Sequence, residues 1–252
     1  MPQGLNVSVV DGSVLLLVLD NPPVNAMSAD ILAAMSEALD AAEDDRELRA
    51  IVLTGVGRVF CSGADLKAAR NVGLADAAGG FGQVLEQLAR SRAPVVAAID
   101  GDCIGGGLEL ALCCDIRIAS TAARFVCAGV NVGLMASAWR LPRLIGPGRA
   151  KAMLLTGSPI DAARAESWGL VTELRAPAAL RDAALALGGR IASRAPLSVE
   201  ATKRVANQAL DLTAEASIEA IRREMAPLLA SRDHKEALSA FVEKREPVFR
   251  RQ

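Results

Sequence analysis

Short runs of apolar residues, separated by glycine, proline and aspartate, dominate the first half of the chain. Runs of four to eight residues bounded in this way are typical of buried β-strands. The first two, NVSVV and SVLLLVLD, flank Asp11-Gly12, a dipeptide that favours a β-hairpin turn of type I′. Four later runs predict further strands: RAIVLTG, APVVAAIDG, DIRIAS and ARFVCAG.

Helical periodicity occupies the segments between these strands and most of the rest of the chain. Ser28 is a suitable N-cap for a helix over about residues 29–43, and further helices are expected at 81–90 and 107–114. The glycine-rich segment 71–80 is predicted to be a surface loop. After about residue 147 the strand signals nearly stop, and we expect helices at 147–156, 161–168, 178–193, 197–210, 213–230 and 234–244. The pattern predicts an α/β core followed by a C-terminal helical region.

The composition excludes several classes of function. The 252 residues are 52% hydrophobic and 23% charged with a formal net charge of −1, so we expect no nucleic-acid partner and no membrane partner. Five cysteines without CxxC spacing and an N-terminus without a signal-peptide pattern predict a cytoplasmic protein with reduced thiols. With one histidine and no tyrosine, a histidine-rich metal site and a tyrosine acid are excluded. A Ser-His-Asp triad would need His234, which lies in a charged stretch.

Two glycine-containing turns carry the candidate chemistry: FCSGADLK, residues 60–67, and CIGGGLEL, residues 103–110. Each follows a predicted strand and opens a predicted helix, so each can leave a backbone N–H unpaired and directed outward. Two such N–H groups on neighbouring strands would form an oxyanion hole. A phosphate site and plain tight packing are the alternatives, although neither G-x-G-x-x-G nor a P-loop motif occurs. Glu109 has a local alternative as well, since with Gly106 as N-cap it would cap the helix at N3.

In these two turns and in several other motifs, the chain resembles the enoyl-CoA hydratase/isomerase, or crotonase, superfamily. RVFCSGADLK resembles its first oxyanion motif, and AAIDGDCIGGGLELALCCDIRIAS is similar to its most diagnostic block. NPPVNAMS resembles its N-terminal substrate loop, and GLVTEL and FVEKREPVF resemble its later signatures. The resemblance implies an α/β fold, a spiral of repeated ββα units over residues 1–190. It also implies a C-terminal helical region, 191–252, for oligomerisation and active-site closure in a homotrimer or homohexamer.

The resemblance also implies what each site residue does to an acyl-CoA substrate. The backbone N–H groups of Ser62 and Gly106 would stabilise the thioester oxygen, and Glu109 would act as general acid/base. Lys244 would reach the CoA phosphates, those of a neighbouring subunit included, although an ordinary solvated lysine is the alternative. No metal and no separate cofactor are implied, because CoA is part of the substrate. The substrate-binding residues would be Ala26, Ser62, Gly63, Ala64, Asp65, Leu66, Gly106 and Lys244.

The chain departs from the family pattern at the second hydratase glutamate. Gly129 stands at that position, and the loop after it is about three residues shorter than usual. Nearby polar side chains are those of Cys127, Asn131 and Ser137, each more typical of packing than of catalysis. Two interpretations follow. We favour an enzyme that hydrates a 2-enoyl-CoA with Glu109. The alternatives are an acyl-CoA-binding protein with little or no turnover and another reaction of the family, such as double-bond isomerisation.

Overall fold

The strands of the computed structural model, which describes residues 4–65 and 74–252, form two sheets. The larger sheet has, in spatial order, β1 (Leu5–Val10), β2 (Val14–Leu19), β3 (Ala50–Gly55), β5 (Val95–Ile99), β7 (Ile116–Ser120) and β10 (Glu173–Arg175). The smaller sheet has β4 (Val59–Cys61), β6 (Asp102–Ile104), β8 (Arg124–Val126) and β9 (Ile160–Asp161). The strand pairs β3–β4, β5–β6 and β7–β8 each place their first strand in the large sheet and their second in the small one. This repetition confirms the predicted α/β spiral of ββα units.

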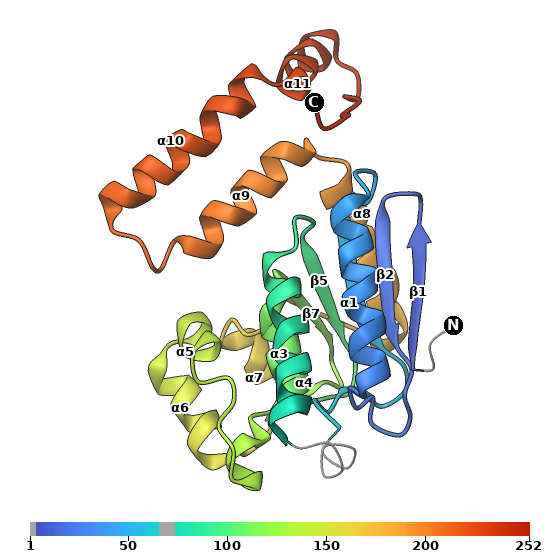
Figure 1. Ribbon diagram of the computed structural model, residues 1–252, viewed down its shortest axis with the longest axis vertical. Coiled ribbons are helices and arrows are strands. Elements are labelled where there is room, and N and C mark those ends of the chain that lie inside the picture. The colour runs from blue at the N-terminus through green and yellow to red at the C-terminus, as the bar shows by residue number, and fades with distance from the viewer. Residues whose placement is uncertain (1–3, 66–73) are drawn as a thin grey trace.

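Helices follow the strand pairs and then continue alone to the C-terminus (Figure 1). In order they are α1 (Ala29–Asp44), α3 (Leu74–Arg90), α4 (Gly106–Cys113), α5 (Arg140–Ile145), α6 (Pro147–Thr156), α7 (Ala162–Ser167), α8 (Pro177–Ala192), α9 (Pro196–Gln208), α10 (Ala214–Ala230) and α11 (Arg232–Glu243). A 3₁₀ helix, Ala128–Val132, precedes α5. Across the described ranges, no helix has both the length and the apolar composition needed to cross a membrane.

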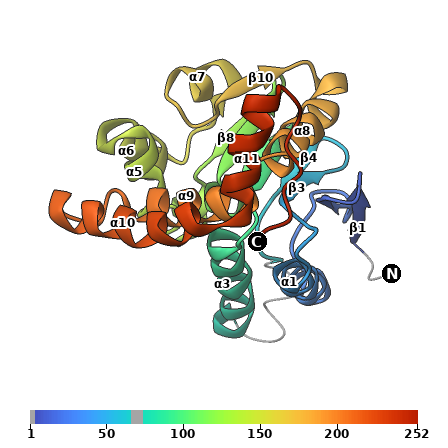
Figure 2. The ribbon, with the colours of Figure 1, turned by 90° about the horizontal axis from the view of Figure 1, so that it is seen from above.

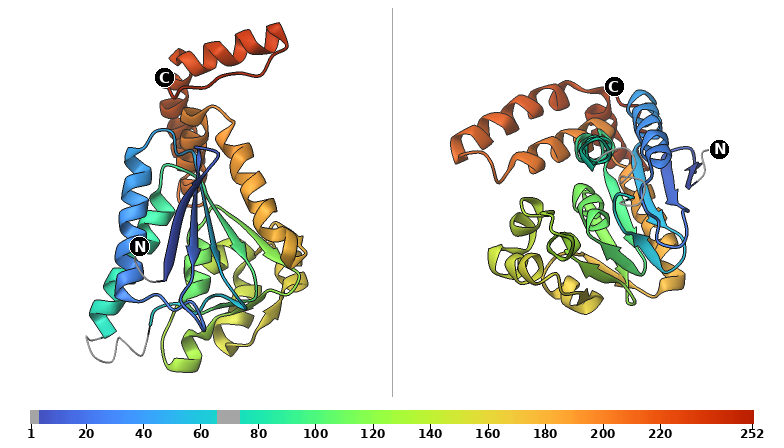
Figure 3. Two further views of the ribbon diagram at one scale, coloured as in Figure 1. Left: turned by 90° about the vertical axis from the view of Figure 1, so that its right-hand side faces the viewer. Right: turned by 60° about the horizontal axis from the view of Figure 1, so that its bottom comes forward.

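The large sheet is covered on both faces, which explains why its strands are apolar without interruption. In β2, Val14, Leu16 and Val18 belong to the core beneath α8, whereas the residues that alternate with them belong to the core beneath α1 and α4. The left view of Figure 3 shows the strands edge-on between the blue α1 and the orange α8. Because each side chain of β2 is buried on one face or the other, its hydrophobic run has no polar alternation.

Local sequence signals predict the longer strands and helices well. Asp11 and Gly12 both have positive φ, 48° and 67°, and join β1 to β2 as an antiparallel hairpin. The Ser28 side chain accepts a hydrogen bond from the N–H of Ile31, so the predicted N-cap of α1 is confirmed. The loop predicted at 71–80 is wrong for its described part, because residues 74–80 form the first turns of α3. The short strands β4, β6, β9 and β10 were not separated from their surroundings by any periodicity.

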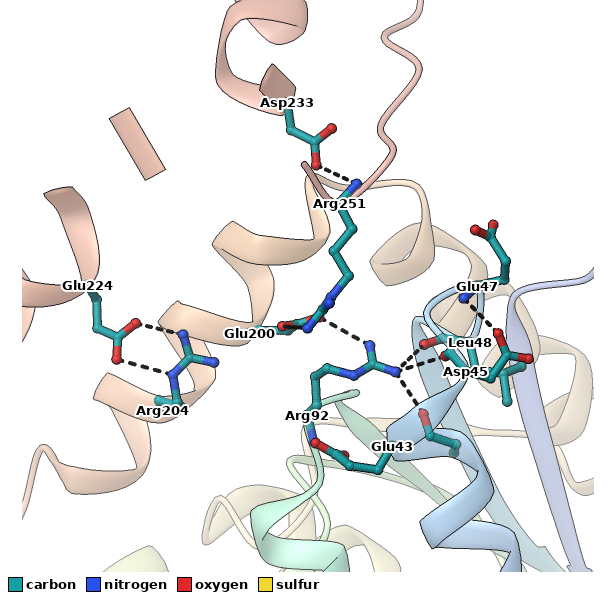
Figure 4. Close-up of polar contacts among 11 residues, drawn as sticks. Glu43, Asp45, Glu47, Leu48, Arg92, Glu200, Arg204, Glu224, Asp233 and Arg251 are labelled. Atoms are coloured by element: carbon teal, nitrogen blue, oxygen red, sulfur yellow. Dashed lines mark hydrogen bonds and ion pairs between the residues drawn. The ribbon is translucent and has the colours of Figure 1, made fainter. Parts of the chain in front are cut away.

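A buried ion-pair network attaches α9 and the C-terminal tail to the core (Figure 4). Glu200 of α9 accepts hydrogen bonds from Arg92, at 3.1 Å, and from Arg251, at 2.8 and 3.0 Å. Arg92 also donates to three main-chain carbonyls around the end of α1. Asp233 of α11 accepts the N–H groups of Arg250 and Arg251. Beyond these contacts α10 runs alongside α9 and away from the sheets (Figures 1 and 2).

We expect Glu200→Gln to lower the free energy of unfolding by about 3 kcal/mol, because it leaves the buried Arg92 guanidinium without its counter-charge. Chemical denaturation monitored by circular dichroism measures this loss. Glu224→Gln is the matched control, since it removes the exposed ion pair with Arg204 and should cost less than about 1 kcal/mol. Equal effects of the two substitutions would contradict a special role for the buried network.

Candidate active site

The two glycine turns predicted from the sequence lie against each other. They follow β4 and β6, which are neighbouring parallel strands. A Cβ on Gly63 would lie 2.7 Å from the Cα and from the N of Gly106, and a Cβ on Gly107 would lie 2.0 Å from the carbonyl oxygen of Cys61. The ring of Phe81, from α3, lies close to Gly106 as well, because a Cβ on Gly106 would be 3.1 Å from two of its ring carbons. The glycines therefore allow two main chains to touch, as the packing alternative expects, and this contact brings the two turns to one place.

The N-terminal loop joins the same cluster through main-chain hydrogen bonds. Met27 and Ala64 form a parallel bridge, in which the Met27 N–H donates to Gly63 and the Met27 carbonyl accepts from Asp65. Asn25, which is buried, holds the loop in place: its side-chain amide donates to the carbonyls of Val56, Val59 and Phe60. The segment NPPVNAMS, which includes Ala26, is thus placed beside SGAD as the sequence motifs imply.

The Ser62 N–H, which the resemblance implies as an oxyanion donor, is hydrogen-bonded within the chain in this structure. The Ser62 N–H donates to the carbonyl of Val24 at 3.1 Å, so it is already used within the N-terminal loop. In a parallel bridge, the N–H of the bridged residue itself faces away from the partner strand. The bridge with Met27 therefore turns the Ala64 N–H outward, and no hydrogen bond engages it among the residues that the structure describes. In the described part of this turn, the Ser62 N–H therefore has a hydrogen bond within the chain and the Ala64 N–H has none.

Gly106 offers the second donor. It is the first residue of α4, where an N–H has no acceptor within its own helix. The positive end of the helix dipole lies at the same place, and it favours a negative charge that develops there. The contact between Gly63 and Gly106 keeps this N–H close to the first turn. Both turns thus present a main-chain N–H within one small region.

Glu109 does not cap the helix as the local alternative expected. The N-cap is Gly105, not Gly106, so Glu109 stands at N4 rather than N3. Its carboxylate instead accepts a hydrogen bond from the main-chain N–H of Ser137, 28 residues further along the chain. Side chains on a helix tilt toward its N-terminus, so this half-buried carboxylate leans toward the end of α4 at which the Gly106 N–H is free.

Position 129 has no room for a larger side chain. A Cβ on Gly129 would lie 2.9 Å from the carbonyl oxygen of Leu134 and 3.1 Å from the amide nitrogen of Ala136. The loop after the 3₁₀ helix therefore folds back over Gly129, and the Leu134 N–H donates to its carbonyl at 2.8 Å. A glutamate at this position would displace that loop. As the loop is folded here, position 129 accommodates glycine and no larger residue.

The other polar candidates of this region have structural contacts. The Asn131 amide donates to the carbonyl of Gly157 at 3.3 Å. Cys127 is buried. Its burial, and to a smaller extent the nearby charge of Glu109, raise the pKa of its thiol to about 12. Of these three candidates only Ser137 hydrogen-bonds to Glu109, and within the described part of the chain its own hydroxyl is buried without a partner.

We expect the native protein to react slowly with a thiol-specific disulfide reagent at neutral pH. All five cysteines are free and buried, and burial raises the pKa of Cys61 and of Cys113 to about 12. A raised pKa keeps the thiol protonated until the pH approaches that value, and only the thiolate reacts. Titration should give all five thiols after unfolding in denaturant and almost none before it. A fast-reacting thiol in the native state would contradict this burial.

The remaining predicted site residues lie partly elsewhere. Lys244 is exposed and ends α11 in a left-handed conformation, at the end of the molecule away from α4 (Figure 1). Within one chain the structure does not bring it to the two turns. His234 is on the same helix α11, so a triad with a residue of the two turns does not form. Leu66 lies outside the described residues.

Comparisons with known proteins agree with this geometry. The sequence model of the family Enoyl-CoA hydratase/isomerase matches residues 10–252. A crotonyl-CoA hydratase of Syntrophomonas wolfei is 36% identical over 244 residues, which cover 93% of each chain. An (E)-benzylidenesuccinyl-CoA hydratase of Thauera aromatica is 38% identical over 257 residues, which cover 99% of each chain. The crystal structure of an enoyl-CoA hydratase from Bacillus anthracis has a TM-score of 0.96 and 30% identity, covering 99% of this chain and 100% of that one.

The chain therefore belongs to the enoyl-CoA hydratase/isomerase family, and it is an enzyme of the hydratase/isomerase type that acts on acyl-CoA. Its similarity to relatives named for different acyl groups is nearly equal, so identity alone does not select the acyl group.

Proposed function

We propose that this enzyme adds water across the double bond of a 2-enoyl-CoA, with Glu109 as its general acid/base. The observation that carries the proposal is the placement of Gly106 and Glu109 three residues apart in the first turns of α4, where the N–H donor is at the helix N-terminus and the carboxylate side chain tilts toward that end. A thioester oxygen held at the N–H would place the carbons of the double bond near that end of the helix. The similarity to several hydratases supports the same reaction.

The N–H groups of Ala64 and Gly106 would stabilise the negative charge that develops on the thioester oxygen. As water attacks C3, the electrons of the double bond move toward this oxygen and give an enolate-like state. Preorganised main-chain donors lower the energy of that state without reorganising, and losing one such donor typically costs about 10²–10³ in rate. Because both donors are main-chain groups, the tight glycine contacts rather than any side chain would determine their positions.

A single carboxylate would serve both proton transfers. Glu109 would take a proton from the attacking water as the new C–O bond forms at C3, and would then return a proton to C2. Atoms balance in this cycle, because the water contributes one proton and the hydroxyl, and the carboxylate ends as it began. The reaction requires no electron acceptor, so CoA as part of the substrate would suffice.

An acyl-CoA-binding protein with little turnover is the second candidate, and Gly129 is the observation that favours it. Without a second carboxylate, one partner for the reacting water is missing. Glu109 argues against this candidate, because binding a neutral acyl group gives no reason to hold a half-buried carboxylate beside it. Double-bond isomerisation would also use the oxyanion donors and one proton carrier. Its product has the mass of the substrate, which distinguishes it from hydration.

We also propose that the enzyme acts in the cytoplasm as a homotrimer or homohexamer, with the C-terminal region 191–252 at the subunit contacts. Helix α10 supports this assembly, because four apolar side chains at helical spacing are about half exposed on it: Ile218, Ile221, Met225 and Leu229. In such an assembly Lys244 would bind the CoA phosphates of a neighbouring subunit. Five free cysteines are in keeping with a reducing compartment.

The experiment that tests the proposed reaction follows the loss of conjugated-thioester absorbance when crotonoyl-CoA or a longer 2-enoyl-CoA meets the purified protein. Hydration removes the conjugation, and mass spectrometry of the product should show the gain of one water. Formation of an isomeric enoyl-CoA without added water would replace hydration by isomerisation. Tight binding of acyl-CoA in calorimetry without any product would favour the binding protein instead.

A further inference from the structure

Ser137 combines three features that require an explanation. Its φ is 59°, in the left-handed region that residues other than glycine seldom adopt. Its side chain is 2% exposed, and its hydroxyl has no hydrogen-bond partner in the part of the chain that the structure describes. Its main-chain N–H donates to the carboxylate of Glu109. Buried hydroxyl groups normally have a partner, and an unpartnered one in a native protein points to a missing water or ligand.

The loop that carries Ser137 is the same loop that closes over Gly129. Gly129 accepts the Leu134 N–H and lies against the main chain of Leu134 and Ala136, and Ser137 is the next residue. The left-handed turn at Ser137 directs its N–H at Glu109, while the Ser137 carbonyl accepts the N–H of Leu141 in α5. One arrangement thus fills the space at position 129 and directs the Ser137 N–H to the carboxylate of Glu109.

We propose that the Ser137 hydroxyl is the second group that hydrogen-bonds to the reacting water. It would orient this water in place of a second carboxylate. This inference rests on the proposed hydratase function. The serine side chain is short, so the Ser137 Oγ stays close to its own N–H and hence to the Glu109 oxygen that accepts it. A water bonded to Glu109 and to Ser137 Oγ would be held at two points before it attacks C3.

The proton balance assigns different tasks to the two residues. Glu109 takes the proton of the water and returns one to C2, whereas Ser137 remains neutral and only orients the oxygen. After the reaction, the same two groups contact the new 3-hydroxyl of the product. Cys127 and Asn131 do not fit this task, because the first is a weak hydrogen-bonding thiol kept protonated by burial and the second already bonds to Gly157.

The first test compares Ser137→Gly with Ser137→Ala by steady-state kinetics on crotonoyl-CoA. Both variants keep the N–H that holds Glu109 and remove the hydroxyl, but glycine accepts a positive φ without strain. We expect kcat to fall by about 10²-fold in both, with KM changed less than about threefold. The melting temperature of Ser137→Gly should not fall, which separates loss of the hydroxyl from loss of the fold. Unchanged kcat in a folded Ser137→Gly protein would overturn the proposal.

The second test needs no turnover, so it distinguishes a failure of this proposal from a failure of the hydratase reaction. Calorimetry would compare 3-hydroxybutyryl-CoA with butyryl-CoA, which lacks the hydroxyl. We expect the wild type to bind the hydroxylated thioester about tenfold more tightly, and Ser137→Gly to lose that preference. Equal preferences in the two proteins, or none in the wild type, would overturn the role of Ser137 whether or not crotonoyl-CoA is hydrated. Wild-type preference that disappears in the variant would support it even if the proposed reaction failed.

Discussion

Glu109→Gln is expected to lower kcat for hydration of crotonoyl-CoA by about 10³–10⁴-fold, the largest catalytic effect among single substitutions in this site. The carboxamide cannot accept a proton from water, and no other carboxylate lies between Asp115 and Asp161 in the sequence to replace it. Its side-chain oxygen can still accept the N–H of Ser137, so the loop should keep its place. Steady-state kinetics measure the expected loss of kcat, and the affinity for butyryl-CoA shows whether the site and its loop keep their place.

Two controls make the result decisive. The melting temperature of Glu109→Gln should match that of the wild type within a few degrees, because neither helix capping nor core packing depends on the charge. Glu109→Asp should also be slow, since the shorter carboxylate withdraws from the reacting carbons while keeping its charge. A Glu109→Gln variant that retained most of the wild-type rate would reject Glu109 as the acid/base and leave the oxyanion donors as the whole of catalysis.

The fold could be predicted from the sequence where a segment is long enough to show a period. Strands β2, β3 and β5 are buried on both faces, so each leaves an unbroken apolar run between turn residues. Strands β4 and β6 have three residues each, fewer than any periodicity requires, and they exist because they pair with each other. β10 also has only three residues, so the sequence does not predict it between the helices, although it pairs with β7 at the edge of the large sheet.

The site could be located from the sequence but not completed. The glycines of the two turns indicate a close approach because only glycine permits it, and this information is local. The choice between Ser62 and Ala64 as donor depends on which carbonyls the N-terminal loop presents, Val24 and Met27, and these are far away in the sequence. The contact between Glu109 and Ser137 is likewise a product of tertiary folding, and a serine in a left-handed turn has no sequence signature of its own.

Gly107→Ala should be the most damaging substitution for the fold at this site. The added Cβ would lie 2.0 Å from the carbonyl oxygen and 2.6 Å from the carbonyl carbon of Cys61, both main-chain atoms of β4 that cannot rotate away. We expect a loss of about 2–4 kcal/mol in the free energy of unfolding, and a melting temperature lower by about 5–15 °C. Differential scanning calorimetry measures both the temperature and the enthalpy of this transition.

Gly189→Ala in α8 is the matched control, because nothing lies within 4 Å of the Cβ that it adds. It replaces an exposed helical glycine, so it should raise stability by about 0.4–1 kcal/mol. The same chemical change would therefore stabilise one helix and destabilise the other. If Gly107→Ala melted like the wild type, the contact between α4 and β4 would not be needed for the fold.

The clash at Gly107 also has a catalytic consequence. Relief of the contact must move α4 away from β4, and this motion separates the Gly106 N–H from the Ala64 N–H that it is expected to complement. A displacement of about 1 Å can cost on the order of 10²-fold in rate. We therefore expect the Gly107→Ala protein that remains folded at low temperature to have a reduced kcat, although it keeps Glu109, Ser137 and both donors. Full activity in that folded fraction would show that the spacing of the two turns does not limit catalysis.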